Sequence, residues 1–196
     1  MKSIRNEPSQ EEIDRFWRQV KQEIKQIPLA FERKQQPALL TGIDVYQVNF
    51  QSLYNETIYG YLLVPKNKSQ LPIVIDYLGY MNHLQEPFQF APFGRGILKK
   101  EDFYMKRMIA DSLRLLEVAA ELPEIDSERV ILRGGSQGGG IALIVNALAE
   151  TPIFATFADV PSHSNISHRI ESRTGSYHVM QEYIDTFPDS KETIYY

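Results

Sequence analysis

The glycine-rich stretch at residues 134–140, GGSQGGG, constrains the fold of this chain more than any other part of the sequence. It contains the pattern G-x-S-x-G, in which Gly134 and Gly138 lie two residues on either side of Ser136. That pattern is typical of the nucleophile elbow of serine hydrolases, a tight turn between a strand and a helix. Side chains at the two glycine positions would crowd such a turn. The pattern therefore predicts an exposed Ser136 hydroxyl above a sheet.

Length and composition limit what the chain can be. Its 196 residues, 43% of them hydrophobic, fit a single domain over residues 1–196 with a buried core. A net charge of −4 without a basic stripe argues against nucleic acid, and no apolar stretch is long enough to cross a bilayer. The first twelve residues lack the apolar run of a secretory signal. With no cysteine for disulfides, we expect a cytoplasmic protein.

Periodicity along the chain predicts alternating strands and helices. A capping box at Ser9 and Glu12 opens a helix that ends before Pro28, and two strands at 43–50 and 57–64 suggest a hairpin. The apolar run 71–77 predicts a strand covered on both faces, and residues 79–96 read as a loop. Four further elements follow, a helix at 102–122, a strand at 129–132, a helix at 141–148 and a strand at 153–160. This order indicates an α/β fold with a mostly parallel sheet.

A serine nucleophile needs a base, a group that orients the base, and donors for the oxyanion. The amide of Gln137, at the start of the helix after Ser136, is one candidate donor. The loop 79–81 is expected to supply the second donor, and Tyr80 is either that donor or an ordinary loop aromatic. His83 in the same loop either contacts substrate or is solvated.

The acid and the base are harder to assign. Three aspartates, Asp159, Asp185 and Asp189, and three histidines, His163, His168 and His178, follow Ser136. Only Asp159 is followed by a histidine, as the order serine, acid, histidine requires. Either one of these histidines reaches Ser136, or all three lie at the surface while Asp159 caps a turn. Their spacing predicts no metal site, and no phosphate-binding loop is present.

Several segments resemble carbohydrate esterase family 7, the acetyl xylan esterases and cephalosporin C deacetylases. The resemblance lies in an N-terminal Phe-Trp helix and in the stretches GYLLVP at 60–65, GRGIL at 94–98, EDFYMKR at 101–107, EVAAELPEIDSER at 117–129, RGGSQGGG at 133–140 and ADVP at 158–161. It implies an α/β-hydrolase fold and removal of acetyl groups from acetylated sugars or antibiotic esters, with no cofactor. The family assembles into hexamers, which leaves a homo-oligomer open here.

The same resemblance assigns roles to individual residues. Ser136 would be the nucleophile, and the amides of Tyr80 and Gln137 would form the oxyanion hole. Gly134 and Gly138 would shape the turn. The Gly79-Tyr80 pair matches the family's HGYGG loop, although Leu78 replaces its histidine and Met81-Asn82 replace its glycines.

Two departures from the family leave the fold incomplete. Residues 79–96 stand where the family has an internal strand with an Arg-Gly-Gln motif, so we expect an unpaired seam beside residues 71–77. The last two strands, which carry the family's triad aspartate and histidine, have no counterpart. The sequence thus supports an esterase acting through a serine acyl-enzyme. The alternative is an inactive, shortened remnant that serves as a binding or structural protein, or a gene fragment.

Overall fold

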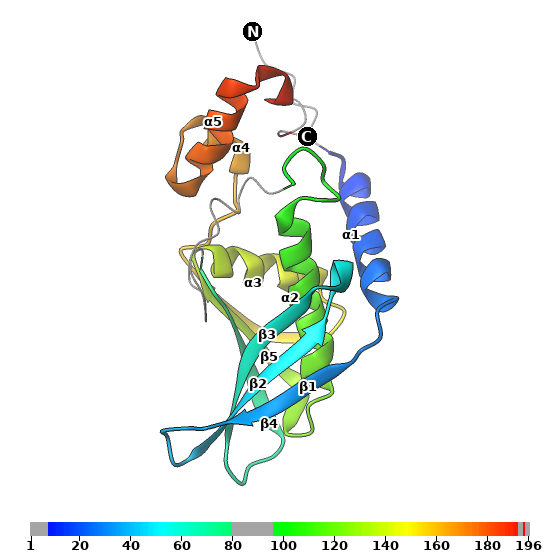
Figure 1. Cartoon of the computed structure of the whole chain (residues 1–196), viewed down its shortest axis with the longest axis vertical. Helices are drawn as coiled ribbons and strands as arrows, with labels where there is room; N and C mark the ends of the chain where they lie inside the picture. Colours follow the sequence, from blue (N-terminus) through cyan, green and yellow to red (C-terminus); the bar gives the residue numbers. More distant parts are fainter. Residues whose placement is uncertain (1–7, 80–95, 192–193, 195–196) are drawn as a thin grey trace.

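A computed structural model describes residues 8–79, 96–191 and 194, and its strands form two separate three-stranded sheets (Figure 1). We call them sheet A, with the order β1-β2-β3, and sheet B, with the order β4-β5-β6. The helices are α1 (Gln10–Lys25), α2 (Tyr104–Ala120), α3 (Gln137–Leu148), α4 (Ile166–Glu171) and α5 (His178–Thr186). Short 3-10 turns lie at Leu53–Asn55, Gly175–Tyr177 and Pro188–Ser190.

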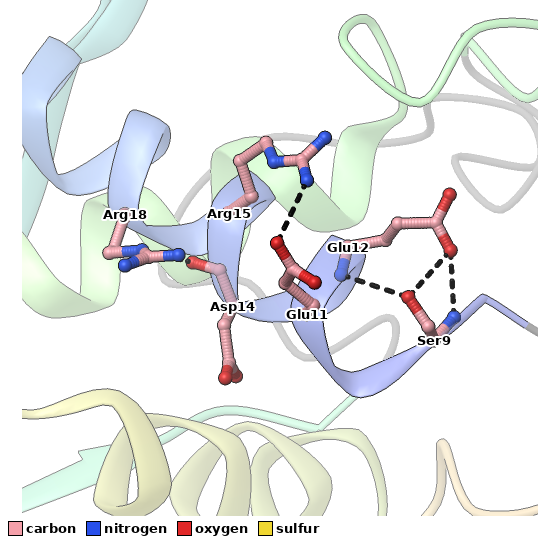
Figure 2. A network of polar contacts seen from close by, with 6 residues as sticks. All are labelled: Ser9, Glu11, Glu12, Asp14, Arg15 and Arg18. Atoms are coloured by element: carbon pink, nitrogen blue, oxygen red, sulfur yellow. Dashed lines mark hydrogen bonds and ion pairs between the residues drawn. The ribbon is translucent and has the colours of Figure 1, made fainter.

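The first helix begins at the predicted capping box. The Ser9 hydroxyl accepts a hydrogen bond from the Glu12 amide, and the Glu12 carboxylate accepts one from the Ser9 amide at 2.8 Å (Figure 2). These bonds satisfy amides that the first helical turn leaves without partners. The predicted apolar stripe then buries Val20 and Ile24 against α2, beside which α1 lies in Figure 1.

Sheet A is antiparallel and contains the predicted hairpin. β2 (Ile43–Gln51) pairs with β3 (Thr57–Pro65) through the Leu53–Asn55 turn, which confirms that prediction. On its other side β2 pairs with β1 (Phe31–Gln36), a strand that the sequence did not reveal because FERKQQ is mostly polar. One face of the sheet packs Val48 and Phe50 against α2, so α2 connects sheet A to the rest of the core.

Sheet B is parallel and leads to the glycine-rich turn. Its strands are β4 (Leu71–Tyr77), β5 (Ile125–Gly135) and β6 (Ile153–Asp159), joined by α2 and α3. Both helices pack on one face of the sheet, where Ile75 and Leu132 are buried. This alternation of strands and helices agrees with the predicted α/β architecture. The main difference is that β5 and α3 each begin four residues earlier than predicted.

The opposite face of sheet B is open among the described residues, and here a prediction was wrong. We expected the strand at 71–77 to be covered on both faces, but Val74 is 54% exposed and Asp76 is also exposed. Arg133 and Phe157 lie exposed on the same face, because they pair with Asp76 and with each other in register. Apolar composition alone could not distinguish a strand covered twice from one covered once.

The expected seam is present in the part of the chain that the structure describes. β4 is hydrogen-bonded to β5 on one side, and no described strand pairs with its other edge. Sheet A and sheet B therefore do not join into one continuous sheet. Within residues 8–79 and 96–191, the α/β-hydrolase architecture is incomplete at the edge of β4 where we expected the seam. Residues 80–95, which include the predicted loop, lie outside the described residues.

A helical unit follows β6 in the upper part of Figure 1. There α4 and α5 pack Ile170, Met180 and Ile184 around Tyr104, at the start of α2. No helix among the described residues has both the length and the apolar content that a membrane span requires.

Candidate functional site

Ser136 lies between the last residue of β5 and the first residue of α3, and it is exposed. Its backbone has φ 53° and ψ −114°, a conformation that residues with side chains rarely adopt. Such a conformation costs on the order of 1–3 kcal/mol and persists only where the surrounding structure enforces it. The turn at Ser136 is therefore held by its neighbours rather than by the serine's own preference.

The glycines around Ser136 show what enforces the turn. A Cβ atom on Gly134 would lie 2.3 Å from the Gly138 carbonyl carbon, and one on Gly138 would lie 1.9 Å from the Tyr77 oxygen. A Cβ on Gly140 would lie 2.4 Å from the Ser162 oxygen. Gly135, in contrast, has nothing within 4 Å of that position. Close backbone packing of β4, β5 and α3 thus requires glycine at 134 and 138, and packing of α3 against the segment after β6 requires it at 140, whereas 135 is unconstrained.

Backbone hydrogen bonds fix the turn to the end of β6. The Ser136 amide donates to the Asp159 carbonyl at 2.9 Å, and the Ser162 amide donates to the Ser136 carbonyl at 2.9 Å. The Gly140 amide also donates to that carbonyl, at 3.1 Å. Both polar backbone groups of Ser136 are consequently occupied, and the side chain is left to face outward.

Gln137 is buried and connects the turn to α2. Its side-chain amide donates to the Tyr104 hydroxyl at 2.9 Å, and Tyr104 itself is 8% exposed. Because Gln137 is the first residue of α3, its backbone amide belongs to the helical turn whose N–H groups lack intrahelical partners. The sequence pointed to that amide but not to the Tyr104 contact. A tyrosine at a helix start is the only signal that could have suggested it.

An open depression surrounds Ser136 at the carboxyl ends of the three strands of sheet B. It is lined by Asp76, Leu78, Gly79 and Val160 together with Gly135. Ligands of open α/β sheets bind outside the carboxyl ends of the strands, so the position is a typical one. Val160, which sequence reasoning did not select, is 76% exposed and has φ 37°. Positive φ at a β-branched residue is uncommon, and no sequence pattern foretold it.

None of the candidate bases is hydrogen-bonded to Ser136 among the described residues. His163 is half-buried, and its Nδ1 lies 2.8 Å from the Tyr177 hydroxyl. Burial lowers the pKa of His163 to about 4, so the imidazole is neutral at pH 7. His178 has its Nδ1 2.7 Å from the Gly175 carbonyl, and His168 lies on α4. His83 lies outside the described residues.

None of the candidate acids is hydrogen-bonded to a candidate histidine among the described residues. Asp159 contributes its backbone carbonyl to the turn, while its exposed carboxylate has no polar partner in the described ranges. Asp185 accepts hydrogen bonds from Gln181 and Arg173, which lower the pKa of its carboxyl. Asp189 lies in the turn after α5. The structure thus brings together Ser136, Gln137, Gly134 and Gly138, and the residues that it describes place no acid–base pair beside them.

Two further expectations concern the second oxyanion donor and a metal site. Tyr80, the expected second oxyanion donor, lies outside the described residues, although Gly79 directly before it lines the depression. Across residues 8–79 and 96–191, no cluster of three or more histidine, cysteine or carboxylate side chains is arranged to hold a metal ion.

Comparisons with known proteins agree with the geometry. A sequence model of the acetyl xylan esterase (AXE1) family matches this chain in two stretches, residues 2–94 and 92–195. The acetyl esterase Axe7A of Xylanibacter ruminicola is 21% identical over 207 residues, which cover 85% of this chain and 47% of that protein. The chain therefore spans about half the length of this curated relative.

Two solved structures share the fold. The acetyl xylan esterase of Paenibacillus sp. R4 superposes with a TM-score of 0.83 at 22% identity, covering 93% of this chain and 72% of that one. Acetyl xylan esterase 1 of Thermoanaerobacterium sp. JW/SL YS485 gives a TM-score of 0.80 at 17% identity, with 96% and 72% covered. More than a quarter of each relative has no counterpart in this chain, as expected for a shortened member of the fold.

Proposed function

Because the chain belongs to the acetyl xylan esterase family, we propose that it is a carboxylic ester hydrolase that removes acetyl groups from acetylated sugars. The observation that supports this most is the backbone of Ser136, whose positive φ and exposed side chain match the demands of a nucleophile elbow. The depression around it lies open to a sugar ester.

The proposed reaction has two steps. First, the Ser136 oxygen attacks the acetyl carbonyl carbon, and the bond from that carbon to the sugar oxygen breaks. The serine proton passes through a base to the leaving sugar oxygen, which departs as a hydroxyl. Water then attacks the acetyl-serine, so that acetate leaves and the serine hydroxyl is regenerated.

The oxyanion formed in each step requires preorganised donors. We assign one to the backbone amide of Gln137, which the helix dipole of α3 assists, and the second to the amide of Tyr80. The hydrogen bond from the Gln137 side chain to Tyr104 supports this role, because it keeps the first residue of α3 in place.

A second candidate function follows because the described part of the chain contains no acid–base pair beside Ser136. With His163 engaged by Tyr177 and no described histidine bonded to Ser136, the chain alone fits a catalytically inactive remnant that binds a sugar or a partner. Loss of triad members leaves a rate only about 10³–10⁴-fold above the uncatalysed reaction, supplied by the oxyanion hole and binding. The two functions therefore differ by orders of magnitude in turnover.

Labelling separates these functions. The purified chain is incubated with a fluorophosphonate probe and, separately, with p-nitrophenyl acetate, beside Ser136→Ala and the matched control Ser162→Ala. An esterase is labelled and hydrolyses the ester, loses both activities in Ser136→Ala, and keeps them in Ser162→Ala. Equal signals from all three proteins would reject the esterase and favour the remnant.

We also propose a second class of substrate and a cellular location. Antibiotic esters of the cephalosporin C type are a second proposed substrate class, because they present the same acetyl carbonyl to Ser136 as an acetylated sugar does. The absence of cysteine fits a protein of the cytoplasm, which needs no disulfide. The proposed reaction uses no cofactor. It also does not require the chain to form a homo-oligomer.

A further inference from the structure

The first turn of α3 has a single side chain with which it can be anchored. The turn consists of Gln137 followed by Gly138, Gly139 and Gly140. Glycine is one of the poorest helix formers, because it loses the most backbone freedom on folding. Since the three glycines have no side chains, only Gln137 can hold this turn to another element through a side chain. Gln137 is 6% exposed, so its side chain is directed into the protein.

The Gln137 side chain is bonded to the start of α2. Its Nε2 atom donates a hydrogen bond to the Tyr104 hydroxyl at 2.9 Å, and both residues are buried. A buried polar group costs free energy unless it is hydrogen-bonded, so this bond favours one position of the glutamine. Because the side chain and the backbone amide belong to the same residue, that position also sets the direction of the Gln137 N–H.

Tyr104 is itself held by the helices that follow β6. It belongs to a buried cluster with Ile170 of α4 and with Met180 and Ile184 of α5. The neighbouring Phe103 ring meets the tyrosine ring edge-on, with 5.3 Å between the two centroids. Packing therefore fixes the position of the tyrosine hydroxyl, and it connects α4 and α5 to the first turn of α3.

An oxyanion donor has to be placed accurately. Such donors act at about 2.7–3.1 Å from the oxyanion, and removing one lowers kcat by about 10²–10³-fold. The Gln137 amide precedes three successive glycines, which give the backbone little rigidity of their own. The bond to a buried tyrosine supplies rigidity at this residue.

We propose that Tyr104 is a positioning residue, which acts through the Gln137 side chain to hold the Gln137 amide where it stabilises the oxyanion. This role rests on the esterase function proposed above. Tyr104 is 8% exposed, and it acts on Gln137 rather than on the substrate. Removing its hydroxyl should therefore impair the chemical step and spare substrate binding.

Steady-state hydrolysis of p-nitrophenyl acetate tests the effect on catalysis. Tyr104→Phe keeps the ring and removes the oxygen that accepts from Gln137. Because the oxyanion forms only during the reaction, kcat should fall about tenfold while KM changes by less than about twofold. The matched control is Tyr177→Phe, which removes a hydroxyl of the same cluster that is bonded to His163. This control should keep kcat within about twofold, and equal losses in the two variants would overturn the proposal.

A double-mutant cycle shows whether Tyr104 acts through Gln137. Gln137→Met keeps the backbone amide and a side chain of similar length, but it cannot donate to the tyrosine. In that background Tyr104→Phe should change kcat by less than about twofold, because the connection is already broken. The same loss of about tenfold in both backgrounds would contradict a role through Gln137.

Amide hydrogen exchange followed by NMR gives a readout that does not require activity. The Gly140 amide, which donates to the Ser136 carbonyl at 3.1 Å, reports on the first turn of α3. The Ala149 amide, which donates to the Val145 carbonyl at 2.8 Å, reports on the other end of the same helix. Tyr104→Phe should accelerate exchange at Gly140 about tenfold and leave Ala149 unchanged. Equal acceleration at both amides, or none at Gly140, would overturn the role of Tyr104.

The two readouts also separate this role from the esterase function. A parent chain that neither hydrolyses the ester nor accepts the fluorophosphonate label would reject the esterase function. Exchange at Gly140 would still decide whether Tyr104 holds the first turn of α3.

Discussion

The turn at Ser136 and the acid–base groups around it differ in how completely the chain builds them. The turn is fixed by close backbone contacts at Gly134, Gly138 and Gly140 and by three backbone hydrogen bonds of Ser136. The imidazole of His163, in contrast, is bonded to Tyr177, and the Asp159 carboxylate has no polar partner among the described residues. The position of Ser136 depends on the described strands and helices of this chain. For the acid and the base, the described residues provide no pair beside Ser136.

The largest expected effect concerns the glycines of the turn. Gly138→Ala places a Cβ where only 1.9 Å separates it from the Tyr77 oxygen, so backbone atoms of β4 or α3 must move. We expect a loss of at least about 3 kcal/mol in the free energy of unfolding, measured by urea denaturation, or failure to fold. Gly135→Ala has open space and should change stability by less than about 0.5 kcal/mol. Equal effects from the two substitutions would show that the turn is not held by close packing.

A second prediction concerns a carboxyl far from Ser136. Asp111 on α2 accepts a hydrogen bond from the fully buried Ser52, and burial raises its pKa from 3.8 to about 6. Glu56 also raises this pKa, and Arg107 opposes it. The folded state then holds a proton that the unfolded state releases, so this group lowers stability as pH rises from about 4 through 6.

Asp111→Asn should remove that penalty while keeping an oxygen that accepts from Ser52. At pH 7 we expect a gain of about 1–3 kcal/mol in the free energy of unfolding, because the pKa difference sets the upper limit. At pH 4 the gain should vanish, since the native carboxyl is protonated there. Urea denaturation at both pH values measures it. A gain of the same size at both would show that the ionisation of Asp111 is not responsible.

The smallest expected effect distinguishes a structural histidine from a catalytic one. Tyr177→Phe removes the hydroxyl that lies 2.8 Å from the His163 ring, and it should cost about 1 kcal/mol of stability. Fluorophosphonate labelling of Ser136 should be unchanged, because His163 is not bonded to the serine. A change of more than about tenfold in the labelling rate would assign His163 to the site after all.

The comparison also explains what the sequence could predict. The turn could be predicted because a tight turn requires glycine at fixed positions in the sequence. The capping box could be predicted for the same reason, since Ser9 and Glu12 are only three residues apart. The hairpin at β2 and β3 followed from strand periodicity. The strand β1 was missed because its residues are polar, and the open face of β4 was missed because coverage depends on distant segments. The bond between Gln137 and Tyr104 joins residues on two helices, and no local pattern encodes it.

The central claim is that Ser136 is positioned as a nucleophile although no acid–base pair stands beside it among the described residues. Intact-mass spectrometry after brief incubation with p-nitrophenyl acetate tests it most directly, with peptide mapping to locate the product. We expect one acetyl group on Ser136, the intermediate formed in the first step of the proposed reaction, and no adduct in Ser136→Ala. An acetyl group that maps to another residue, or that forms equally in Ser136→Ala, would contradict the claim.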